Sequence, residues 1–209
     1  MDSESRFEIK YNFKNFDEFF LKKKFFRKKN LKKNYDDRII NSIYYDTSNL
    51  KSANDNLAGI SYRKKFRVRW YNRENFFKFE IKSKQNKLTT KIIIDEGYFA
   101  EKNNFLSKQV DQFLKKNYLK KICKISYLRS YYKYKDIRIT LDRKIKYDSL
   151  IDNKKSKYIF SKDIVLEIKY LPNLTNSNNV NYLVHDLPIL VSRNSKYLNS
   201  LNDLGILKF

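Results

Sequence analysis

The stretch SYRKKFRVRW, residues 61–70, alternates cationic with largely apolar side chains. Because successive side chains of a strand point to opposite faces, an extended chain here lines one face with four cations, Arg63, Lys65, Arg67 and Arg69. Like charges that close repel one another by roughly 0.2–1 kcal/mol per pair on a sheet. The row therefore favours a strand whose charged face meets an anionic partner.

Composition is consistent with such a partner but does not identify it. Of the 209 residues, 46 are Lys or Arg and 23 are Asp or Glu, which gives a net charge of +23. A content of 41% hydrophobic and 16% aromatic residues excludes a disordered chain. The length predicts a single domain over residues 1–209 with a substantial core. Nucleic acid, a phospholipid surface and polyphosphate all remain open as partners.

Several classes of protein are disfavoured. The single cysteine, Cys123, excludes an internal disulfide and a cysteine-based zinc site. The only histidine, His185, is not accompanied by a G-x-S-x-G elbow, and the chain lacks a P-loop and a dinucleotide fingerprint. No apolar run reaches the ~18 residues of a membrane span, and the first residues lack the apolar stretch of a signal peptide. A cytoplasmic location is the expectation.

Extended segments dominate the predicted secondary structure, and their alternation follows the opening pattern. Eight strands are expected, near residues 6–12, 39–46, 60–71, 76–84, 89–95, 123–133, 136–143 and 163–171. NREN at 72–75 predicts a tight hairpin between the third and fourth. Helices are expected from Asn15, over 106–117 and over 195–204, where apolar residues recur at helical spacing.

The charged faces of these strands allow two architectures. One is an open antiparallel sheet whose cationic face binds nucleic acid. The other is a barrel in which the apolar face packs outward under the helices and the charged face lines the lumen. A lumen lined by cations must hold water, anions or metal, because bare charge there is strongly unfavourable.

Read in order, the segments RFEIKY, SIYYDT, YRKKFRVRWY, FEIKSK, YLRSYY, IRITLD, VLEIKY and NSKY resemble the catalytic domain of the VTC (vacuolar transporter chaperone) polyphosphate polymerases. That family belongs to the triphosphate tunnel metalloenzymes, which are related to the CYTH phosphatases. The resemblance runs from Arg6 to about Tyr197. It implies an α+β fold built on a closed, eight-stranded antiparallel barrel, with a basic lumen and flanking helices.

The resemblance also implies roles for individual residues. It gives phosphate-binding roles to the catalytic set Arg67, Arg69, Arg129, Arg138 and Lys196, and to the substrate-binding residues Lys10 and Lys82. Glu167 matches the metal-binding glutamate of the family, and Glu8 and Glu80 stand where other tunnel enzymes carry acidic residues. Strand parity adds further candidates for the lumen, namely Arg6, Arg63, Lys65, Lys84, Lys91 and Lys169.

The resemblance implies a polyphosphate polymerase that uses Mn²⁺ or Mg²⁺ to move the γ-phosphoryl group of ATP onto a growing chain. A triphosphatase in the same tunnel and a non-catalytic binder of polyphosphate or nucleic acid are the alternatives. ATP and polyphosphate are the expected partners, and no specific nucleic acid is expected. The basic segment LKKKFFRKKNLKK at 21–33 is either a solvated helix or a docking surface for an emerging polyanion or an anionic membrane.

Overall fold

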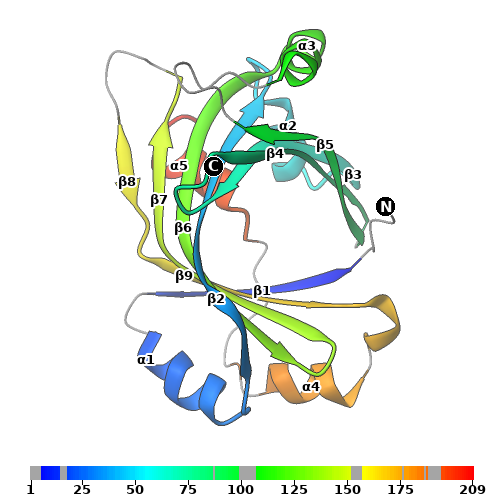
Figure 1. Ribbon diagram of the computed structural model, residues 1–209, viewed down its shortest axis with the longest axis vertical. Coiled ribbons are helices and arrows are strands. Elements are labelled where there is room, and N and C mark those ends of the chain that lie inside the picture. Colours follow the sequence, from blue (N-terminus) through cyan, green and yellow to red (C-terminus); the bar gives the residue numbers. More distant parts are fainter. Residues whose placement is uncertain are drawn as a thin grey trace.

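Antiparallel strands form most of the protein (Figure 1). The computed structural model describes residues 6–14, 18–86, 88–98, 107–151, 157–175, 177–185, 187 and 194–209, without the side chain of Lys24. The strands are β1 (Phe7–Lys14), β2 (Lys32–Asp46), β3 (Tyr62–Tyr71), β4 (Phe76–Gln85), β5 (Leu88–Tyr98), β6 (Lys120–Tyr134), β7 (Ile137–Ser149), β8 (Tyr158–Phe160) and β9 (Asp163–Tyr170). Among the described residues, every helix is too short or too polar to cross a bilayer.

The helices are short (Figure 1). They are α1 (Glu18–Phe20), the π-helix η2 (Leu21–Arg27), α2 (Lys51–Leu57), α3 (Lys108–Lys116), the 3-10 helix η3 (Pro172–Leu174), α4 (Asn178–His185) and α5 (Lys196–Asp203). The eight expected strands and the hairpin at 72–75 are confirmed, whereas α2, α4 and the short β8 were not anticipated. Asn15, Phe16 and Leu106, which the helix predictions used, lie outside the described residues.

The strands form one sheet in the order β1-β9-β7-β6-β2-β3-β4-β5, with β8 paired to β7. The closed barrel is not confirmed, because in the described residues no ladder joins β1 to β5; Arg6, just before β1, forms an isolated bridge with Thr89 of β5. A continuous ladder would bring the two charged strands to about 5 Å from each other. Instead the sheet curls so that β3, β4 and β5 lie opposite β1 and β9 (Figure 1).

Two apolar clusters cover the outer face of the sheet. One packs Leu21 and Phe25 of η2 against Ile139 and Leu166. The other seats Val110 and Leu114 of α3 on β3 and β4. A third cluster lies on the opposite, inner face, where Tyr197, Leu198 and Leu201 of α5 pack on β2, β6 and β7. Its strand residues include Tyr44, which is paired with Arg67, so the face that carries the cation row is apolar where α5 covers it and charged over the part that lines the interior.

Candidate functional site

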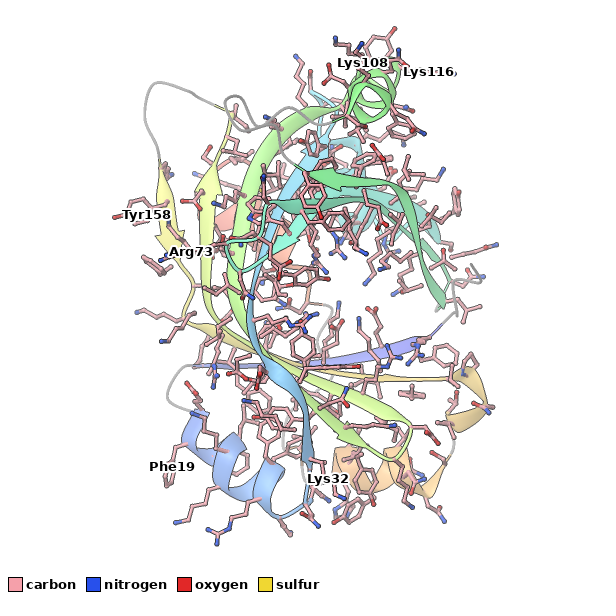
Figure 2. The ribbon with its side chains drawn as sticks, in the orientation of Figure 1. Phe19, Lys32, Arg73, Lys108, Lys116 and Tyr158 are labelled. Atoms are coloured by element: carbon pink, nitrogen blue, oxygen red, sulfur yellow. The ribbon has the colours of Figure 1, made fainter. Side chains whose placement is uncertain are left out.

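Two connected cavities lie on the charged face of the sheet. The larger, called the wide compartment, has a volume of about 610 Å³, and the smaller, the inner compartment, about 100 Å³. They share five lining residues, Lys10, Lys65, Lys82, Asn194 and Ser195. Figure 2 shows polar side chains of the facing strands pointing toward one another across this space.

The cation row of β3 runs from one compartment into the other. Arg63 and Lys65 line the wide compartment, and Lys65, Arg67 and Arg69 line the inner one. The hairpin to β4 sets Lys65 opposite Lys82 and Arg67 opposite Glu80. Strand alternation therefore places this row inside the molecule, with Phe66 and Val68 packed outward against the α3 cluster.

Glu8 and Glu167 form the first group of acidic residues in the site. Lys10 contacts both carboxylates, at 3.5 Å from Glu8 and 3.4 Å from Glu167, and Lys169 does so at 3.3 and 3.4 Å. Lys82 contacts Glu8 at 3.0 Å. Burial and the charge of Glu167 would raise the pKa of Glu8, but the three ammonium groups outweigh them and lower it to about 2.

Glu80 belongs to a separate group. Arg67 donates from Nε and Nη2 to the same Glu80 oxygen, at 2.7 Å in each case, and Lys91 lies 3.4 Å from the other oxygen. The Glu80 side chain is only 1% exposed. Burial would raise its pKa, but the charge of Arg67 prevails and lowers it to about 2. Glu80 is thus a fixed counter-ion of Arg67.

Asp142 forms the third group, and the sequence analysis did not assign it to the site. Its fully buried carboxylate accepts two hydrogen bonds from Arg129, at 2.6 and 2.7 Å, and one from Lys196, at 2.6 Å. Burial would raise the pKa of Asp142, but Arg129 and Lys196 lower it. Asp142 shares strand parity with Arg138 in IRITLD, so alternation alone could have placed it on the charged face.

Two tyrosines complete the inner compartment and were also missed. Tyr44 accepts from Arg67 at 3.3 Å, and Tyr127 accepts from Arg69 at 3.3 Å. Burial would raise the pKa of Tyr127, but the charges of Arg129 and Arg69 lower it. Tyr127 lies two positions before Arg129, which is the strand spacing that could have identified it.

Lys65 resembles Arg69 in that, within the described residues, it forms no ion pair with a carboxylate and donates to a hydroxyl group. It donates to the hydroxyl of Ser195 at 2.8 Å. Burial and the surrounding cations, Lys10 and Lys82 foremost among them, hold the pKa of Lys65 well below the usual lysine value. Ser195 immediately precedes the expected Lys196 and caps α5 with the same side chain.

Most of the expected site residues converge here, with three exceptions. Lys84 lines the wide compartment, and Lys10, Arg129, Lys169, Lys196 and Glu167 line the inner one. Arg138 is exposed and lies outside the lining of both compartments. Lys91 reaches the site only through Glu80, and Arg6 takes part in the bridge to Thr89. Arg138 stands at the outer end of its strand, next to the turn into β7.

The carboxylates can be tested as ligands for the expected divalent ion. In the part of the chain that the structure describes, no three His, Cys, Asp or Glu side chains form a metal-binding group. Mg²⁺ is nevertheless commonly held by one or two carboxylates together with substrate phosphates. Glu167 suits this role best, because its closest cation contacts are 3.4–3.7 Å, whereas Glu80 and Asp142 are held at 2.6–2.7 Å. Glu167 therefore fits a divalent ion best, Glu8 is held more closely by Lys82 at 3.0 Å, and Glu80 does not fit.

Solved structures with the same fold agree with this architecture. A protein of Pyrococcus horikoshii OT3 is 16% identical, with 95% of this chain and 99% of that chain covered and a TM-score of 0.54. A candidate adenylate cyclase of Bacillus halodurans is 14% identical, with 93% and 97% covered and a TM-score of 0.55. A candidate adenylyl cyclase of Hippeastrum, described as having a dominant triphosphatase activity, is 12% identical, with 94% and 95% covered and a TM-score of 0.55.

At these identities the likeness concerns the fold alone. No curated protein matches the sequence significantly. The family comparison is more specific, because the model of the VTC domain matches residues 5–204. That range includes every strand of the sheet, all lining residues of the inner compartment and those of the wide compartment except Phe209. With nearly its whole length matched, this chain belongs to the VTC domain family.

Proposed function

We propose that the protein is a metal-dependent polyphosphate polymerase that transfers the γ-phosphoryl group of ATP to the end of a polyphosphate chain. In this reaction a terminal oxygen of the acceptor forms the new P–O bond, and the bond to ADP breaks. The observation that carries the proposal is the inner compartment, a cavity of about 100 Å³ that is lined by Arg67, Arg69, Arg129 and Lys196. Membership of the VTC domain family supports it.

The chain's own residues supply most of what phosphoryl transfer requires. Arginine forks match phosphate oxygens, and cations fixed in a dry site stabilise the charge of the transition state. Glu80 and Asp142 hold Arg67, Arg129 and Lys196 in place before a substrate arrives. Glu167 and Glu8 would hold Mn²⁺ or Mg²⁺, which would neutralise the phosphate oxygens when bound.

The protonation state of the acidic residues favours transfer to phosphate over transfer to water. The carboxylates of Glu8, Glu80, Asp142 and Glu167 all have lowered pKa values, because nearby cations outweigh burial. Carboxylates of such low pKa are weak general bases near neutral pH. The end of a polyphosphate chain arrives already ionised and needs no base, whereas water does.

A tunnel-fold triphosphatase is the second candidate. The likeness to the Hippeastrum protein, which is described as having a dominant triphosphatase activity, supports it. Hydrolysis would use the same cations and the same divalent ion, with water in place of the acceptor chain.

The decisive experiment is to incubate the protein with ATP and Mn²⁺ and to separate the products by length. Long phosphate chains with stoichiometric ADP are expected. Orthophosphate alone would replace the polymerase with the triphosphatase, and tight polyanion binding without turnover would leave a binding module. Glu167→Gln serves as the control, because it keeps the side chain's shape and removes one negative charge from the ion site; most activity should be lost, together with Mn²⁺ affinity.

A further inference from the structure

The wide compartment has two walls of different chemistry. One wall is cationic and is formed by strands, with Arg63 and Lys65 from β3 and Lys82 and Lys84 from β4. The other wall is uncharged and comes from α2, α5 and the segment that follows each of them. Its residues are Asn56, Leu57, Gly59, Leu198, Asn199 and Phe209. The cationic wall was expected from the sequence, whereas α2 was not. The residues of the uncharged wall take no part in the ion pairs of the site described above.

The difference between the two walls restricts the chemical class of ligand that fits this compartment. A polyphosphate chain carries charge on every side and gains nothing from leucine and phenylalanine side chains. A nucleotide has one polyanionic end and one planar, uncharged end with polar edges. The volume of about 610 Å³ lies within the range of small-molecule sites. We propose that the uncharged wall binds the nucleobase and ribose of the donor ATP while its phosphates lie along the cationic wall; this inference rests on the proposed function.

The side chains of the uncharged wall suit a nucleobase. Asn56 and Asn199 are partly buried, and within the described residues neither side-chain amide has a hydrogen-bond partner in the protein. An asparagine amide offers one acceptor and two donors, which match the edge of an adenine. The Phe209 ring, 64% exposed, offers a face for base stacking.

The same placement orients the nucleotide in the site. Lys65 and Lys82 belong to both compartments, so a phosphate tail that starts at the uncharged wall passes them before it reaches Arg67 and Arg69. The terminal phosphate would then lie in the inner compartment, beside Glu167. The wall therefore distinguishes a nucleoside triphosphate from inorganic triphosphate, which has no group to place there.

The test compares ATP with inorganic triphosphate, each measured by isothermal titration calorimetry. Asn56→Ala/Asn199→Ala is the test variant, and alanine is favourable in both helices, so the fold should be retained. Loss of two hydrogen bonds should weaken ATP binding about tenfold or more and leave inorganic triphosphate unchanged. Lys84→Gln, on the opposite wall, is the matched control and should weaken both ligands.

The outcomes separate this inference from the proposed function. Equal losses for both ligands, or unchanged ATP affinity in Asn56→Ala/Asn199→Ala, would overturn the nucleobase site and leave the polymerase standing. A parent protein that binds neither ATP nor inorganic triphosphate would overturn both. A selective loss of ATP affinity, reproduced by Phe209→Ala, would establish the uncharged wall as the nucleoside subsite.

Discussion

Arg67 and Arg69 lie two positions apart on the same face of β3, yet their surroundings differ. Arg67 is held by the buried carboxylate of Glu80 at 2.7 Å. Arg69 donates only to hydroxyl groups, those of Ser42 at 3.1 Å and Tyr127 at 3.3 Å. The alternation of the strand makes the two arginines equivalent, but their electrostatic roles in the folded protein differ.

Alanine substitution should therefore separate stability from binding. Arg67→Ala should lower the free energy of unfolding by roughly 3–5 kcal/mol, because Glu80 loses its closest partner in a buried site. Arg69→Ala should cost less, since within the described residues Arg69 forms no close ion pair and acts on Glu80 only as the second of the charges that lower its pKa. Each variant should weaken triphosphate binding about ten- to a hundredfold. Chemical denaturation and calorimetry measure the two effects.

A double substitution provides the control for this prediction. Arg67→Ala/Glu80→Gln should recover much of the lost stability, because no unpaired carboxylate remains, but it should not recover triphosphate affinity. If Glu80→Gln gives no recovery, the ion pair is not the source of the stability of this region.

The lowered pKa of Lys65 predicts how the stability of the folded protein changes with pH. Its pKa in the folded protein lies well below the unfolded value of 10.5, so between these two values the unfolded chain binds more protons. Its contribution to stability therefore rises as pH rises through that window. Lys10, Lys82, Arg63 and Arg67 are the charges that lower the pKa.

A bound triphosphate supplies negative charge and should therefore raise the pKa of Lys65. Lys65 should take up a proton when the triphosphate binds. Calorimetry at one alkaline pH, in two buffers of different ionisation enthalpy, measures that proton. Lys65→Gln should reduce the uptake, whereas Lys120→Gln, an exposed cation at the start of β6, should not change it. The remaining uptake is expected at Lys82, whose pKa burial lowers to about 7 and which lines the same compartments. Uptake that is unchanged in Lys65→Gln would assign the proton to other groups alone.

At the scale of elements, the basic segment 21–33 combines a packing face with a charged face. Leu21, Phe25 and Phe26 of η2 are buried, and their i, i+4, i+5 spacing suits the wider turn of a π-helix. Lys29 is also buried and donates to the carbonyl of Tyr182 at 2.5 Å. Both aromatic residues of the segment, which suggested a docking surface, are thus core residues, while Lys22, Lys23 and Arg27 stay exposed.

The exposed cations of this segment should bind anionic surfaces weakly and through charge alone. Lys22→Gln/Lys23→Gln/Arg27→Gln should reduce adhesion to vesicles that contain phosphatidylserine and to duplex DNA, with a smaller salt dependence than the parent protein. Triphosphate affinity should stay the same, because these residues line neither compartment. Vesicle sedimentation at several salt concentrations measures the first effect. Unchanged adhesion would place the anionic contact elsewhere on the surface.

For the whole molecule, the enclosed charge predicts strong stabilisation by a small polyanion. Inorganic triphosphate at a hundred times its dissociation constant should add about 2.7 kcal/mol to the free energy of unfolding. A DNA duplex, whose major groove alone is about 12 Å wide, should not reach compartments of about 610 and 100 Å³. Thermal shifts with each ligand, in the parent and in Arg69→Ala, test this. A parallel loss of DNA binding in Arg69→Ala would mean that the cation row is accessible from outside.

The sequence by itself determined the strands and the face on which each charge lies. Side chains alternate between the two faces of a strand in any sheet. The segments RFEIKY, FRVRW and VLEIKY therefore specify both the strand and its charged side without long-range information. The same parity also contained Tyr127 and Asp142, which were missed because no local pattern marks a tyrosine or an aspartate as part of a phosphate site.

Only the tertiary structure decided which charges meet. The separation along the sequence is 13 residues between Arg67 and Glu80. It is 54 residues between Asp142 and Lys196, and 74 residues between Glu8 and Lys82. The Arg67–Glu80 pair follows from the register of the β3–β4 hairpin. The pair of Lys82 with Glu8, which joins strands that are not neighbours in the sheet, depends on how far the sheet curls, and so does the gap between β1 and β5 where a closed barrel was expected. Curvature arises from twist and packing summed over all strands, and no single segment encodes it. For that reason the cationic lining could be predicted from the sequence, whereas the counter-ions, the exposed position of Arg138 and the uncharged wall could not.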